Sequence, residues 1–140
     1  MSDKHADALR SCKLKVTPKR MALVELLSGA SAYQGPQQIW KQLRKSFKKL
    51  GLPTVYRNLE ELVEAGLVNR IIHPNRQLYY FLCANHLHHH HFICIDCGKV
   101  EDIGSCAVKK LDNEVSHKHG GKILSHLLQV NGLCRDCSKK

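Results

Sequence analysis

Two Cys-x-x-Cys pairs are the clearest chemical feature of the sequence. Cys94 and Cys97 form the first pair, Cys134 and Cys137 form the second, and 36 residues separate them. Two intervening residues let both thiolates of a pair reach one tetrahedral ion, and Gly98 permits the tight turn that this requires. Together the pairs predict a closed, structural zinc site with four cysteine ligands. Bound zinc can contribute on the order of 10 kcal/mol to the folding of a small domain.

A redox role is the alternative for these cysteines. Redox Cys-x-x-Cys motifs are typical of a thioredoxin-like strand–helix–strand unit, which the surrounding sequence lacks. The chain has seven cysteines, an odd number, and its polar start is not a signal peptide. Both observations argue against a disulfide framework and favour reduced thiols in the cytoplasm. Cys12 and Cys106 have no partner at a ligand spacing, so we interpret them as small apolar fillers.

Four consecutive histidines, residues 88–91, lie between the lone Cys83 and Cys94. Successive side chains of a strand point to opposite faces, so His88 and His90 would point one way and the other two the other way. One strand could then supply two ligands to each of two sites. We therefore expect at least one regulatory metal site in this segment.

Other candidate ligands follow the histidine run. Residues 100–103 are predicted to form a strand that presents Glu101 and Asp102 on opposite faces. His126 lies between leucines, and its residue type alone fits either a core position or a metal ligand.

The elements that must position these residues differ between the two halves of the chain. Residues 1–83 carry 14 Lys and Arg against 6 Asp and Glu, whereas residues 84–140 carry 8 against 6. Five of the seven cysteines and eight of the ten histidines lie after residue 83. This contrast predicts two small domains, a basic one over residues 1–83 and a metal-rich one over residues 84–140.

The basic half is predicted to contain helices followed by a hairpin. Thr17-Pro18 indicates a helix start, with the helix ending at Gly29. A second helix follows Gly35-Pro36 with an apolar stripe to residue 50, and a third follows Thr54 as its N-cap and stops at residue 66. The β-favouring runs 67–72 and 78–82 flank a turn at 73–76. This order indicates a winged helix-turn-helix.

The formal net charge of +10 favours a polyanionic partner, with double-stranded DNA as the first candidate. The N-terminal residues of the last helix of the pair would enter the major groove. These are Thr54, Tyr56, Arg57 and Asn58. Basic residues around the earlier helix start suit phosphates or a minor groove. These are Lys13, Lys15, Lys19 and Arg20.

Several function classes do not fit the sequence. No stretch is apolar and long enough to cross a bilayer, and no feature indicates a small-molecule substrate. A zinc hydrolase or deaminase would need His-Glu-x-x-His, or His-x-Glu followed by Pro-Cys-x-x-Cys, and neither is present, so we expect no enzyme activity. A zinc buffer or chaperone would leave Tyr56-Arg57 and the uneven charge unexplained.

Several motifs together resemble the ferric uptake regulator (Fur) superfamily over nearly the whole chain. They are Leu14-Lys15-Val16-Thr17-Pro18-Lys19-Arg20, Thr54-Val55-Tyr56-Arg57-Asn58-Leu59, the His run with Cys94-x-x-Cys97-Gly98-Lys99, and Gly132-Leu133-Cys134-x-x-Cys137. The resemblance implies an α+β homodimer with an N-terminal winged helix-turn-helix domain, a hinge near residue 83, and a C-terminal α/β dimerisation domain. It implies a metal-responsive repressor in which Lys15 lies near a minor groove and Tyr56 and Arg57 act from the recognition helix.

The resemblance also implies a regulatory metal site at the hinge. Iron and peroxide sensors place a His and an acidic residue where this chain has Tyr33 and Leu82, whereas Cys83 matches a ligand of members similar to the zinc uptake regulator. Thiolate with imidazole suits Zn²⁺, and Fe²⁺ or Mn²⁺ is the alternative. The implied ligands are Cys83, His89 and His91, with Asn69, His73 or Asp102 as the fourth.

A second regulatory site is implied by the same resemblance. It would contain His88, His90, His126 and a carboxylate. The matching carboxylate position holds Lys109, so Glu101 or Glu114 would have to replace it.

Overall fold

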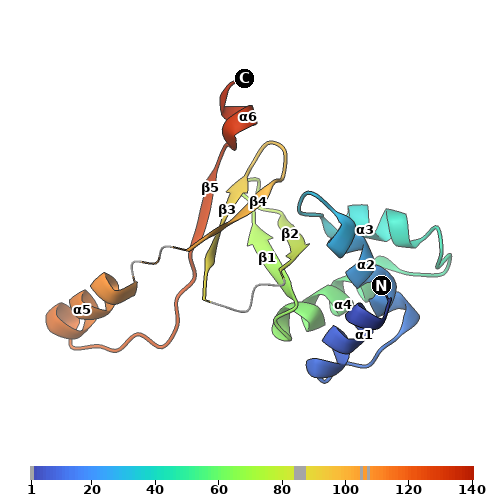
Figure 1. Cartoon of the computed structure of the whole chain (residues 1–140), viewed down its shortest axis with the longest axis horizontal. Coiled ribbons are helices and arrows are strands. Elements are labelled where there is room, and N and C mark those ends of the chain that lie inside the picture. Colours follow the sequence, from blue (N-terminus) through green and yellow to red (C-terminus); the bar gives the residue numbers. More distant parts are fainter. Residues whose placement is uncertain (1, 84–87, 105, 107) are drawn as a thin grey trace. The chain divides into compact units, whose positions relative to one another are not determined.

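The computed structural model describes residues 2–83, 88–104, 106 and 108–140 (Figure 1). The chain divides into two compact units, Met1–His86 and Leu87–Lys140. The boundary predicted after residue 83 adjoins residues 84–87, which lie outside the described residues, so it stays a prediction. In the described part of the chain, no helix combines the length and apolarity that crossing a membrane requires.

The first unit consists of helices followed by a hairpin. The helices are α1 (Ser2–Ser11), α2 (Pro18–Gly29), α3 (Pro36–Leu43) and α4 (Leu52–Glu64). The antiparallel strands β1 (Val68–Ile72) and β2 (Leu78–Leu82) follow, with Val68 opposite Leu82. The α+β winged helix-turn-helix predicted from the sequence is confirmed, and α1 is an addition that the polar N-terminal sequence did not indicate.

One predicted helix start, at Thr17, was correct and another, at Thr54, was wrong. At α2 the Thr17 hydroxyl accepts a hydrogen bond from the Arg20 backbone N–H at 3.2 Å, as an N-cap does. At α4 the N-cap is Gly51, with extended backbone angles (φ −94°, ψ 153°), rather than Thr54. Pro53 lacks an N–H and therefore fits the first helical turn, which moves the start of the helix ahead of Thr54.

Helix α3 is shorter than its apolar stripe predicted. It ends at Leu43, and the chain turns so that the Trp40 indole N–H donates to the Leu50 carbonyl at 2.9 Å. Phe47 and Leu50 still pack against the core of this unit from the turn. Apolar spacing therefore identified the buried residues correctly but not the helical length.

The core of the first unit consists of aliphatic residues packed around Tyr80. Tyr80 of β2 is fully buried, and its hydroxyl donates to Glu60 Oε2 at 2.7 Å. Burial, followed by the contact with Glu60, raises the pKa of Tyr80. The surrounding buried residues are Leu9, Leu23, Val24, Leu27, Ile39, Leu43, Leu50, Val55, Leu59, Leu62, Leu67 and Val68.

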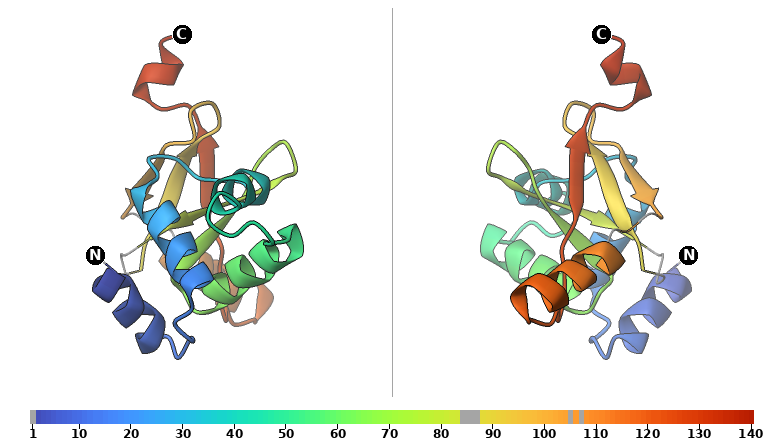
Figure 2. Two further views of the ribbon diagram at one scale, coloured as in Figure 1. Left: turned by 90° about the vertical axis from the view of Figure 1, so that its right-hand side faces the viewer. Right: turned by 90° about the vertical axis from the view of Figure 1, so that its left-hand side faces the viewer.

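The second unit is a small sheet with two helices. Its strands are β3 (His90–Cys94), β4 (Val100–Ile103) and β5 (Gln129–Gly132), in the order β4-β3-β5. Strand β3 pairs antiparallel with β4 and parallel with β5, as the arrowheads in Figure 2 show. Helix α5 (Val108–His119) has no buried residue in the described structure, and α6 (Arg135–Ser138) follows β5. The central strand β3 therefore contains His90 and His91, and the other two histidines of the run directly precede it.

Candidate metal centres and nucleic-acid interface

The four cysteines of the Cys-x-x-Cys pairs converge at one end of β3. All four sulfurs lie within 4.8 Å of one another, and Cys97 Sγ is 3.7 Å from Cys134 Sγ. With Zn–S distances of about 2.3 Å, sulfurs at the corners of a tetrahedron lie about 3.7–3.8 Å apart, so the donors fit zinc. The turn after Cys97 requires Gly98, whose φ is +84°.

The surroundings of these thiols favour at least one thiolate. Burial raises the pKa of the Cys94 thiol, but backbone N–H groups of Cys97, Cys134 and Asp96 outweigh it and bring the pKa to about 6. Burial and the neighbouring thiols raise the pKa of Cys137. All seven cysteines are free, and three members of the cluster are buried. The arrangement can hold a metal ion but does not form a disulfide.

A second group of donors lies on one face of β3 and β4. The His89 and His91 Nε2 atoms are 3.0 Å apart, and Asp102 Oδ1 is 3.4 Å from His91 Nε2 and 3.8 Å from His89 Nε2. Burial and His89 lower the pKa of His91, while Asp102 raises it. The two imidazole side chains are mostly buried and Asp102 is half exposed, and the three donors together can bind a divalent ion.

The other residues predicted for this hinge site belong to the first unit. Cys83 follows β2, and Asn69 lies on β1 opposite Phe81. His73 supports the hairpin turn, since its Nδ1 accepts from the Asn75 backbone N–H at 3.0 Å. Among the three candidates for the fourth ligand, Asp102 lies in the same unit as the two imidazoles and contacts both of them.

A third group lies on the opposite face of β3, as the strand alternation predicts. His88 and His90 contact Cys106 Sγ at 3.4 and 3.2 Å, and His126 Nε2 lies 3.4 Å from Cys106 Sγ and 3.2 Å from His90 Nε2. His90 is buried, and burial followed by the nearby His88 and His126 lowers its pKa. The lowered pKa favours the neutral form of the His90 imidazole, which is the form that binds metal.

The third group corrects the interpretation of Cys106 as an apolar filler. The carboxylates considered for this site, Glu101 and Glu114, lie 3.5 and 3.6 Å from Lys99 and Lys118 instead. Cys106 is the one cysteine of the metal-rich half outside the two pairs, and that isolation was the signal available in the sequence. Cys12, in contrast, packs against the core of the first unit as a filler should.

The residues predicted to contact DNA lie around α2 and the start of α4. Tyr56 is 41% exposed, and Arg57, Lys15 and Lys19 are also exposed. Val55 and Leu59 on the opposite side of α4 are buried, so the helix presents its polar face outward. Thr54 is half-buried, and its carbonyl accepts from Asn58 Nδ2 at 3.1 Å.

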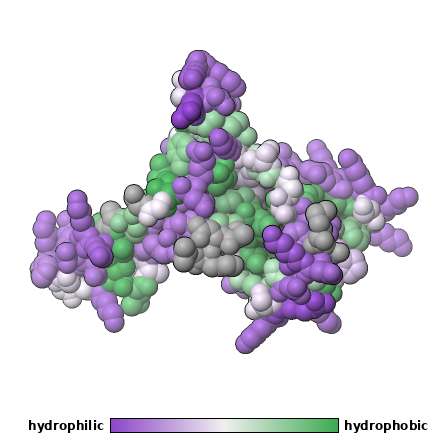
Figure 3. Space-filling view, in the orientation of Figure 1, coloured by the Kyte–Doolittle hydropathy of each residue, from purple (hydrophilic) through white to green (hydrophobic). Residues whose placement is uncertain are grey.

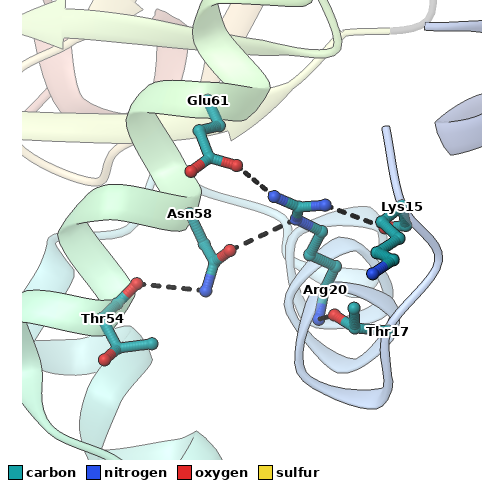
Figure 4. A network of polar contacts seen from close by, with 6 residues as sticks. All are labelled: Lys15, Thr17, Arg20, Thr54, Asn58 and Glu61. Carbon is teal, nitrogen blue, oxygen red and sulfur yellow. Dashed lines mark hydrogen bonds and ion pairs between the residues drawn. The ribbon is translucent and has the colours of Figure 1, made fainter. Parts of the chain in front are cut away.

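Arg20 joins these two helices through a polar network (Figure 4). Its guanidinium forms an ion pair with Glu61, donates to Asn58 Oδ1 at 3.3 Å, and donates to the Lys15 carbonyl at 3.0 Å. The Arg20 side chain is only 14% exposed. The network fixes the segment that carries Lys15 against the helix that carries Tyr56 and Arg57.

Comparison with known proteins gives the family. The model of the ferric uptake regulator family matches residues 11–131. The chain belongs to the ferric uptake regulator family. It is therefore a metal-dependent transcription regulator.

Relatives of this ferric uptake regulator family member carry three different names. It is 30% identical over 135 residues to the peroxide operon regulator of Bacillus subtilis, covering 96% of this chain and 91% of that protein. It is 34% identical to the ferric uptake regulation protein of Yersinia pestis (91% and 86% covered). It is 33% identical to the zinc uptake regulation protein of Mycobacterium tuberculosis (89% and 95% covered). Overall similarity therefore does not distinguish the metal.

The fold matches solved structures of the family. A structure described as a zinc uptake regulator complexed with zinc and DNA superposes with a TM-score of 0.79 at 24% identity, covering 99% of this chain and 93% of that one. At this identity the match establishes the fold, and the metal has to be argued from the donor atoms.

Proposed function

We propose that this family member is a zinc-responsive repressor that acts as a homodimer on inverted-repeat operators of metal-uptake genes. It binds DNA when Zn²⁺ occupies the hinge site formed by Cys83, His89, His91 and Asp102. The convergence of His89, His91 and Asp102 on one face of the sheet carries the proposal.

The donor chemistry supports zinc over iron or manganese. Imidazole and carboxylate alone suit Fe²⁺ and Mn²⁺ as well as Zn²⁺, so the thiolate of Cys83, six residues before His89 in the sequence, decides the preference. Tyr33 is buried, and its ring contacts the rings of His73 and Tyr79, which gives it a packing role. The iron, manganese and peroxide alternatives therefore depend on Cys83 not being a ligand.

Surface properties of the second unit support the homodimer. Leu124 and Leu127 are 88% and 102% exposed, and Leu111 and Leu128 are also exposed. Green apolar surface lies beside the α5 end in Figure 3. Apolar surface of this kind is buried in a stable homodimer, so a second copy of the unit is the partner proposed for it.

The winged helix-turn-helix supports the proposal of an inverted-repeat operator. In a helix-turn-helix dimer, recognition helices enter successive major grooves, so their spacing decides whether both half-sites are bound. Bound zinc would supply a fixed link between Cys83 and the two imidazoles. To move an orientation equilibrium from 1:99 to 99:1, the ion must bind the DNA-competent arrangement more tightly by about 5.5 kcal/mol.

Cys83→Ser tests the hinge assignment, with Cys12→Ser as the matched control. A duplex selected from a random pool in the presence of zinc serves as the operator. We expect Cys83→Ser to lose zinc-dependent operator binding but to keep the structural zinc and the dimer, while Cys12→Ser behaves as wild type. Unchanged zinc-dependent binding by Cys83→Ser would show that the hinge thiolate is not the sensor. Stronger activation by buffered Fe²⁺ or Mn²⁺ than by Zn²⁺ would replace zinc with that ion.

A further inference from the structure

The cluster around Cys106 has a donor set that differs from the carboxylate-containing site expected there. Its four members come from three segments of the second unit: the start of β3, the segment after β4, and the segment before β5. Cys106 Sγ lies 3.2–3.4 Å from the Nε2 atoms of all three histidines, His88, His90 and His126. The sulfur is therefore central to the cluster.

The separations between donor atoms match a tetrahedral metal site. With Zn–N of about 2.0–2.1 Å and Zn–S of about 2.3 Å, a regular tetrahedron places nitrogens about 3.3–3.4 Å apart and sulfur about 3.6 Å from each nitrogen. The observed S–N distances are 3.2–3.4 Å and the His90–His126 distance is 3.2 Å. All four donors lie within 4.8 Å of one another, so one ion can contact all of them.

Hydrogen bonding alone accounts poorly for this packing. His90 Nε2, His126 Nε2 and Cys106 Sγ form a closed triangle in which each atom contacts the other two. A ring nitrogen either donates one proton or accepts, so such a triangle cannot have three well-directed hydrogen bonds. A cation at the centre satisfies all the lone pairs at once.

We propose that Cys106 is a thiolate ligand of a second metal site, completed by His88, His90 and His126, and that the site takes a borderline-soft divalent ion of the Zn²⁺ class. A thiolate in place of a carboxylate lowers the affinity for Mn²⁺ and Fe²⁺ relative to Zn²⁺ and Co²⁺. The proposal does not depend on the hinge site, because none of the four ligands belongs to it.

Alkylation of Cys106 in the full chain, with its structural zinc retained, is the direct test. All metal except the structural zinc is first removed from the protein. The protein is then treated with iodoacetamide with and without added Zn²⁺, and peptide mass spectrometry measures the alkylation of each cysteine. We expect Zn²⁺ to slow alkylation of Cys106 at least tenfold and to leave Cys12 unchanged. His126→Ala should remove the protection of Cys106, whereas Cys83→Ser should keep it. An alkylation rate of Cys106 that does not depend on Zn²⁺ would overturn the proposal.

Metal preference supplies a second measurement. Cys106→Ser and Cys106→Asp are compared with wild type and Cys12→Ser by Zn²⁺, Co²⁺ and Mn²⁺ titration with metal analysis, and circular dichroism verifies the fold. Cys106→Ser should weaken Zn²⁺ binding at this site, and Cys106→Asp should shift its preference toward Mn²⁺. The thiolate-to-Co²⁺ absorption should fall in both variants but not in Cys12→Ser. If both variants retain the wild-type preference and absorption, the ligand role of Cys106 is wrong.

Discussion

Arg20 of α2 donates a hydrogen bond to Asn58 Oδ1 of α4 over 3.3 Å. The same guanidinium pairs with Glu61 and reaches the carbonyl of Lys15. Arg20 belongs to a motif predicted to contact phosphates, but its guanidinium contacts three residues of the protein itself. Its effect on DNA binding is expected to act through the position of the recognition helix.

Arg20→Ala is expected to lower both stability and operator affinity. The substitution leaves Asn58 and Glu61 without their shared donor, at a cost of about 1–3 kcal/mol. Thermal unfolding and operator binding measure the two effects. Lys19→Ala is the control, because Lys19 is exposed and its loss should reduce the salt dependence of binding while stability changes by less than about 0.5 kcal/mol. Equal stability of the two variants would contradict the positioning role.

Arg57→Ala is expected to weaken operator binding by about 1–3 kcal/mol at every zinc concentration, because Arg57 is exposed on the recognition helix. Metal content should not change. Arg135→Ala removes the same charge from the second unit and should leave operator affinity nearly unchanged. Fluorescence anisotropy with a labelled duplex gives both affinities, and equal losses would indicate a general charge effect.

Tyr80→Phe is expected to destabilise the first unit by about 1–2 kcal/mol. The variant removes a buried hydroxyl that donates to Glu60 at 2.7 Å. Tyr79→Phe is the matched control, since the hydroxyl of Tyr79 contacts exposed groups and its loss should cost less than about 0.5 kcal/mol. Urea unfolding measures the free energy of unfolding of both variants. Equal values would show that the contact with Glu60 contributes nothing to stability.

Leu127→Glu is expected to shift the dimer toward monomer. The side chain of Leu127 is fully exposed in the single chain, so the charge should not affect folding of the unit itself, but it would be buried in the proposed dimer. Sedimentation at several protein concentrations measures the dissociation constant. Leu78→Glu, the same change at an exposed leucine of the hairpin, serves as the control. An unchanged dimer in Leu127→Glu would place the interface elsewhere.

Cys94→Ser is expected to remove the structural zinc and unfold the second unit. The four-cysteine cluster holds the end of β3 to α6, and zinc of this kind contributes on the order of 10 kcal/mol. Metal analysis and hydrogen exchange of residues 88–104 and 108–140 measure the loss. The first unit has its own core, so its helices should keep their protection. A protected sheet in the zinc-free variant would show that the metal is dispensable for this unit.

Local patterns made much of the fold predictable. Cys94 and Cys97 are separated by two residues, so a single turn brings them together. The alternation of His88–His91 follows from the two-residue period of a strand. The isolation of Cys106 marked it as unusual, but its contacts with His90 and His126 could not be read from a local pattern, because these residues are 16 and 20 positions away. Helix α3 ends at Leu43 although its apolar stripe continues, since Phe47 and Leu50 reach the core from a turn.

The strand β3 and the two residues before it contribute to all three donor clusters. His88 and His90 serve one face, His89 and His91 serve the other, and Cys94 belongs to the four-cysteine end. Deleting one residue between His91 and Cys94 would move every imidazole to the opposite face while the cysteine end stayed anchored. His88 and His90 would then take the places of His89 and His91, so the two faces would exchange their imidazoles while the four-cysteine end kept its ligands.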